Sequence, residues 1–176
     1  KSQSTQLVEL VLASELWHMP GLGDAYATID VNGHKEHWHV RSNAFRQWLA
    51  REYFSTCERA AGVQALQDAI ITIEARAKYN GDEHPSFVRV AEHEGRLYLD
   101  LAEPQWRAIE IDAEGWRLLD TCPVRFRRAK AMQALPVPQA GGSINDLRRF
   151  INVTDDDWPL LLGWLVASFR PTGPYP

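Results

Sequence analysis

The sequence has few cysteines and no long hydrophobic run, and each shortage excludes a class of protein. Only two of the 176 residues are cysteines, Cys57 and Cys122, and they form no CxxC pair. A disulfide scaffold is therefore excluded, and we expect a reduced, cytoplasmic chain. The longest apolar stretch covers residues 159–169, whereas spanning a bilayer takes about 18–20 residues. Because residues 1–9 are polar and unlike a signal peptide, we expect no membrane partner.

The common catalytic motifs are missing as well. The glycines at 21–23 and 141–142 are not followed by the Lys-Ser/Thr pair of a nucleotide-binding P-loop. The sequence has no GxSxG nucleophile motif. Its close acidic pairs, Glu92 with Glu94 and Asp112 with Glu114, fall at the tips of expected hairpins, where solvated acids are common. We therefore predict no catalytic residue and no cofactor for this chain.

What the sequence does contain is typical of a folded domain. It is 45% hydrophobic and 24% charged, and its seven Trp, six Phe and five Tyr supply the bulk of a core. An Asn32-Gly33 pair lies between the alternating segments 25–31 and 34–40, which predicts a β-hairpin with a tight type I′ turn. That turn sets the register, so that Thr28 faces His37 and Tyr26 faces His39.

Periodicity and turn residues predict the remaining elements. Apolar residues at helical spacing indicate helices at 3–16, 42–54 and 63–78. Two more hairpins are expected at 86–92 with 97–101 and at 107–112 with 116–119, and an edge strand at 124–128. The predicted fold class is α+β, with antiparallel hairpins forming a sheet, two packed helices, and a C-terminal helical segment.

Composition divides the chain into three parts. Residues 1–132 are expected to form the α+β domain, and the Pro- and Gly-rich segment 133–142 a linker. Residues 143–176 form the C-terminal helical segment, in which Ser143 with Asp146 and Thr154 with Asp157 resemble capping boxes.

Two histidines offer a possible metal site. His37 and His39 share one face of the first hairpin, about 7 Å apart along the strand. A metal site would need a third ligand brought in by folding. The alternative is that both rings pack against Thr28 and Tyr26 on a solvated sheet face.

A basic segment is the clearest functional signal. Residues 125–149 carry six basic residues against one acidic residue, a net charge of +5 in a chain whose total is −4. Arg125, Arg127, Arg128 and Lys130 could contact phosphates of single-stranded or duplex DNA, with Phe126 stacking on a base. The alternative places Phe126 in the core and pairs the arginines with acidic residues.

Tryptophans mark a second candidate surface. Trp158 and Trp164 lie in the C-terminal helical segment among leucines. They could form the face of a partner-binding helix, or they could be ordinary core residues.

Several long segments also carry a resemblance. Residues 25–54, 64–102, 107–120, 123–128 (PVRFRR) and 155–176 (DDDWPLLLGWLVASFRPTGPYP) resemble the region that precedes the P-loop in ATPases of bacteriophages and mobile elements. Those ATPases are similar to primase-associated replicative helicases. The resemblance implies that 143–176 leads to an ATPase domain, that DNA replication is the setting, and that this chain is not itself the enzyme.

Three hypotheses remain open. The first is a non-catalytic accessory domain of a helicase-like ATPase that contacts nucleic acid through the four basic residues. The second is a protein–protein assembly module without DNA contact, whose partner is a primase or, through the ATPase domain, a second copy. The third is a small metal-dependent enzyme that uses His37 and His39.

Overall fold

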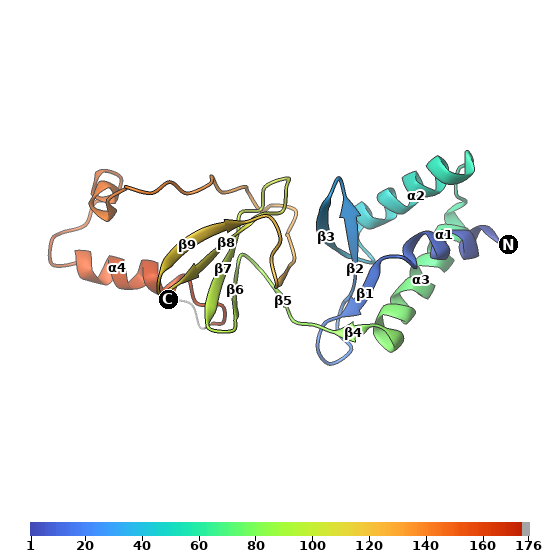
Figure 1. Cartoon of the computed structure of the whole chain (residues 1–176), viewed down its shortest axis with the longest axis horizontal. Helices are drawn as coiled ribbons and strands as arrows, with labels where there is room; N and C mark the ends of the chain where they lie inside the picture. The colour runs from blue at the N-terminus through green and yellow to red at the C-terminus, as the bar shows by residue number, and fades with distance from the viewer. Residues whose placement is uncertain (174–176) are drawn as a thin grey trace. The chain divides into compact units, whose positions relative to one another are not determined.

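The fold was examined in a computed structural model that describes residues 1–173 (Figure 1). The chain forms two compact units. Unit 1 contains residues 1–86 and 125–127, and unit 2 contains residues 87–124 with the segment that begins at Arg128. Both units combine helices with antiparallel strands, which confirms the predicted α+β class.

Unit 1 is a four-stranded sheet with three helices. Its elements are α1 (Gln3–Val11), β1 (Glu15–His18), β2 (Ala25–Val31), β3 (His34–His39), α2 (Asn43–Cys57), α3 (Val63–Asn80) and β4 (Asp82–Glu83). The strand order is β3-β2-β1-β4, antiparallel except that β4 runs parallel to β1. The three helices lie together on one side of the sheet (Figure 1). A further short sheet joins β5 (Ser86–Phe87) to β10 (Arg125–Phe126).

The first hairpin forms as predicted. Asn32 and Gly33 both have positive φ, 53° and 85°, which the tight turn requires. The register pairs Thr28 with His37 and Tyr26 with His39. Alternate residues of β2 therefore point to opposite faces of the sheet.

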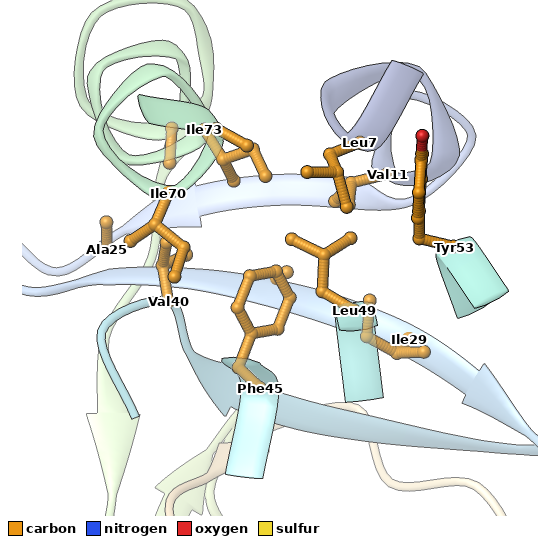
Figure 2. Close-up of a cluster of buried hydrophobic side chains, with 13 residues drawn as sticks. Leu7, Val11, Ala25, Ile29, Val40, Phe45, Leu49, Tyr53, Ile70 and Ile73 are labelled. Carbon is orange, nitrogen blue, oxygen red and sulfur yellow. The ribbon is translucent and has the colours of Figure 1, made fainter. Parts of the chain in front are cut away.

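One of those faces carries the core of unit 1. Side chains from α1, α2 and α3 meet those of β2 in one buried cluster (Figure 2). Its largest fully buried members come from all three helices: Leu7 and Val11, Phe45 and Leu49, and Ile73. On the other face, the Trp17 and Tyr26 rings stack with centroids 4.5 Å apart.

Unit 2 is built on a second four-stranded sheet. The strands β6 (Val90–His93), β7 (Arg96–Asp100), β8 (Ala108–Asp112) and β9 (Gly115–Leu119) form an antiparallel meander in sequence order. The predicted hairpins are thus present, but the first belongs to a different sheet from the other two. The 3₁₀ helix η1 (Ile144–Arg149) and the helix α4 (Trp158–Ala167) complete the unit.

Several of the predicted elements differ from the structure in their bounds or type. The strand predicted for 86–92 divides into β5, which pairs with β10, and β6, which begins at Val90. The helix predicted for 3–16 ends at Val11, and residues 15–18 form β1. Strand β1 pairs with β2 on one side and with β4 on the other, and this pairing overrides the local helical pattern. The predicted edge strand 124–128 shortens to Arg125–Phe126. The predicted helix at 143–150 is a 3₁₀ helix.

The compact units do not begin and end at the predicted domain boundaries. The chain passes from unit 1 to unit 2 after Ser86, because the meander that begins at Val90 forms a sheet of its own. The segment predicted as a linker, 133–142, belongs to unit 2. Whether 1–132 and 143–176 act as separate domains stays a prediction, and residues 174–176 lie outside the described residues.

Candidate interaction surfaces

Arg125, the first of the four basic candidates, is used inside unit 1. Its guanidinium makes an ion pair with Glu15 and lies 5.3 Å from the centroid of the Trp17 ring. Only 19% of the Arg125 side chain is exposed. The neighbouring Phe126 is buried, so its ring is not available to stack on a base.

Arg128 is held even more completely, within unit 2. Its guanidinium donates two hydrogen bonds to the Asp100 carboxylate, at 2.9 and 2.6 Å, and a third to the Glu103 carbonyl oxygen at 2.6 Å. It also lies 3.8 Å from the centroid of the Trp106 ring. The Asp100 side chain is only 2% exposed. The geometry is therefore that of a structural ion pair.

Arg127 and Lys130 differ from these two because they are exposed. Arg127 lies close enough to Tyr26 to act on its hydroxyl: burial raises the pKa of Tyr26, and the Arg127 charge opposes that rise. The structure thus separates the four predicted residues into two that are held by carboxylates and two that face solvent.

The other arginines of the basic stretch also have acidic partners. Arg148 makes an ion pair with Asp155 and stacks 4.2 Å from the centroid of the Trp158 ring. Arg149 pairs with Asp146 at 2.6 Å. The segment that is basic in sequence is thus partly neutralised in the folded chain.

The two histidines pack as the non-metal alternative describes. A hydrogen bond of 3.0 Å joins His37 Nδ1 to Thr28 Oγ1, and the His39 ring meets the Tyr26 ring edge-on at 5.5 Å. Within residues 1–173 no group of three His, Cys, Asp or Glu side chains could hold a metal ion. The described residues therefore supply no third ligand for His37 and His39.

A shallow depression also lies in unit 1, with a volume of about 360 Å³. Small, charged and apolar residues line it: Ala13, Ser14, Glu15, Thr28, Ile29, Asp30, Lys35 and Trp48. Asp30 and Lys35 face each other across the β2–β3 hairpin. The charged groups there are paired neighbours rather than an arrangement aimed at one reacting atom.

Cys122 does not resemble an activated nucleophile. Burial raises the pKa of Cys122 to about 11, and the nearby carboxylates of Asp100 and Glu110 act in the same direction. Activation would require the opposite shift, toward the thiolate.

Helix α4 exposes several large apolar side chains. Trp158, at its first turn, is buried with 8% exposure. Leu160, Trp164 and Val166 are 72%, 49% and 74% exposed. Of the two tryptophans predicted to bind a partner, Trp158 is a core residue and Trp164 lies on the surface.

This exposed surface contains residues that sequence reasoning missed. The tryptophans drew attention to α4, but Leu160 and Val166 are more exposed than either. A signal was available: residues 158–169 contain no charged side chain, whereas a surface helix normally has a charged or polar face.

Comparison with known proteins adds no relative. No protein-family model, curated protein or solved structure matches this chain. Among residues 1–173, no helix combines the length and apolar character needed to cross a bilayer.

Proposed function

We propose that this chain is a non-catalytic accessory module that binds another protein through the exposed apolar side of α4. The observation that carries the proposal is the exposure of Leu160, Trp164 and Val166 on a helix with no charged residue. Leu160 and Trp164, four residues apart, are neighbours on one side of the helix, and neighbouring exposed apolar side chains are typical of interaction sites. Tryptophan is also enriched among the residues that dominate binding energy.

The sequence resemblance suggests where such a module works. It favours a cytoplasmic replication protein of a phage or mobile element, in which the module adjoins a helicase-like ATPase domain. A P-loop sequence ending in Gly-Lys-Ser/Thr, encoded shortly after Pro176, would support this context. A primase is the alternative partner.

Site-specific photocrosslinking in the producing cell tests the proposal. Trp164 is replaced by a photoreactive benzoyl-phenylalanine, and the crosslinked peptides are identified by mass spectrometry. We expect crosslinks to a P-loop ATPase or a primase. The matched control places the same group at Ile71, an exposed apolar residue of α3 that is 51% exposed. Equal crosslinking at both positions, or none at position 164, would contradict the proposal.

Nucleic-acid binding is a second candidate, favoured by the exposure of Arg127 and Lys130. Two phosphate contacts on a single strand contribute about 1.4 to the slope of log affinity against log salt. The double variant Arg127→Ala/Lys130→Ala should therefore bind a labelled single-stranded oligonucleotide more weakly and lose that much of the slope, as measured by fluorescence anisotropy. Arg59→Ala/Arg76→Ala, at two exposed arginines elsewhere, is the control. Identical slopes for both double variants would exclude this surface.

A further inference from the structure

One side of α4 carries a regular seam. Leu160, Gly163 and Ala167 follow one another at spacings of three and four residues, which places them on one side of the helix, beside Trp164. We call these four residues the docking seam. The opposite side begins at the buried Trp158 and continues through the less exposed Leu161, Leu162 and Leu165.

Gly163 has no side chain, so the helix backbone is exposed at the middle of this seam. A Cβ at this position would meet no atom within 4 Å, so nothing in residues 1–173 covers it. Small residues on a helix face allow a second helix to approach closely. The leucine and tryptophan beside it supply the apolar area that a second helix would cover.

The seam has a single unpaired charge at each end. Asp155 is paired with Arg148, and Asp157 is bonded to the Thr154 hydroxyl. Asp156, between them, is exposed and has no ion pair or side-chain hydrogen bond within residues 1–173. Arg170, beyond the other end of the helix, is also exposed and unpaired in the described chain.

These two charges are complementary for a second copy of the same chain. When two identical helices run antiparallel with Gly163 facing Gly163, residues equally far from the centre face each other. Asp156 lies seven residues before Gly163 and Arg170 seven residues after it. Both residues lie outside α4, Asp156 before its first residue and Arg170 after its last. The antiparallel arrangement therefore brings the Asp156 end of each helix beside the Arg170 end of the other, and the pair forms twice in a symmetric dimer.

We propose that two copies of this chain associate through antiparallel α4 helices, with the docking seams in contact and Asp156 paired with Arg170 of the second copy. The inference rests on the proposed function of α4 as a docking element and names the partner. It places self-association within this chain rather than in a further domain. Because one short helix buries little area, the dimer is transient and forms at high protein concentration.

Charge reversal in the full 176-residue chain tests the register. Asp156→Arg and Arg170→Asp each turn two attractive contacts into two repulsive ones, so each variant should dimerise about tenfold more weakly than the wild type. An equimolar mixture of the two variants should restore dimerisation, because only the mixed dimer regains both opposite-charge contacts. Sedimentation velocity from micromolar to submillimolar concentration measures all three.

Controls separate register from folding and from net charge. Asp120→Arg and Arg59→Asp make the same charge changes at exposed positions away from α4 and should dimerise like the wild type. Leu160→Glu should abolish the dimer, and Ile71→Glu should not. Circular dichroism must show the same helix content for every variant compared, since the altered side chains are exposed.

The outcomes separate this inference from the proposed function. A wild-type chain that stays monomeric, or reversal variants that associate as it does, would overturn the dimer. Crosslinks from position 164 to an ATPase or primase would still support the proposed function in that case. Crosslinked peptides that come only from residues 1–176 of a second copy, and none from a P-loop domain or a primase, together with rescue in the mixture, would support the dimer and contradict the replication partner.

Discussion

At the residue scale, Arg128 explains why a basic run in a sequence need not be a basic surface. Its guanidinium forms an ion pair with Asp100, which is almost fully buried, and also stacks over the Trp106 ring. A buried carboxylate without a partner is far less stable than one with a bidentate arginine. Arg128 therefore belongs to the stability of unit 2.

Removing that side chain should be costly. Arg128→Ala leaves Asp100 buried and unpaired, so we expect unit 2 to lose about 3–5 kcal/mol of unfolding free energy, as measured by urea denaturation. Arg149→Ala, which removes an ion pair whose side chains are 73% and 58% exposed, should cost at most about 1 kcal/mol. If the two variants unfold at the same urea concentration, Arg128 has been assigned the wrong role.

The Cys122 thiol gives a second residue-scale prediction. Its raised pKa, about 11, leaves about one thiolate in a thousand at pH 8, whereas an unperturbed cysteine has about one in four. In a Cys57→Ser background, iodoacetamide should therefore alkylate native Cys122 about 250-fold more slowly than the urea-unfolded chain. The native rate should rise about tenfold with each pH unit from 8 to 10, since alkylation follows the thiolate. A native rate close to the unfolded one would disprove the burial of this thiol.

At the element scale, Gly81 fixes how α3 ends against β1. Gly81 follows the last residue of α3 and has an ordinary extended conformation, with φ of −88°. A Cβ here would lie 2.3 Å from the Leu16 carbonyl oxygen and 2.6 Å from that of Ala77. The requirement for glycine is therefore one of space.

A methyl group at this position should loosen unit 1. Gly81→Ala forces the backbone of β1 or of α3 to move, and we expect a loss of about 1–3 kcal/mol or more in unfolding free energy. Gly142→Ala, where the new Cβ meets no atom within 4 Å, should unfold like the wild type. An unchanged midpoint for Gly81→Ala in thermal or urea unfolding would show that β1 does not pack against the end of α3 this closely.

Elements with strong local signals were predicted correctly. Asn32-Gly33 specified the first hairpin and its register because both central residues accept positive φ. The hydroxyl of Ser42, the first residue of the predicted helix 42–54, caps α2 by accepting from the Phe45 N–H at 3.1 Å. Such signals depend only on residues close together in sequence, so they can be recognised without knowing the tertiary contacts.

Elements that depend on distant partners were missed. Strand β1 has only four residues, and its pairing with β4 joins Trp17 to Asp82, a separation that no local pattern encodes. The alternatives for the basic segment stayed open for the same reason, since Glu15 and Asp100, which hold Arg125 and Arg128, lie far away in sequence. The sequence supplied the candidate residues, and only folding showed which remain available.

At the scale of the whole molecule, the two units differ in what they bury and what they expose. Unit 1 buries a core between three helices and a sheet, and His37 and His39 pack on the sheet's other face. Unit 2 carries the meander and, on α4, the exposed side chains of Leu160, Trp164 and Val166. The net charge of −4 does not favour broad electrostatic attraction to nucleic acid.

The central claim is that the docking seam of α4 is covered by a second copy of the chain. Amide hydrogen exchange of residues 158–167, followed as the wild-type concentration rises, measures that burial directly. Exchange in α4 should slow with concentration, exchange in α3 should not change, and the Leu160→Glu variant should exchange at the dilute wild-type rate throughout. Exchange in α4 that is independent of concentration, up to the highest that the protein tolerates, would contradict the claim.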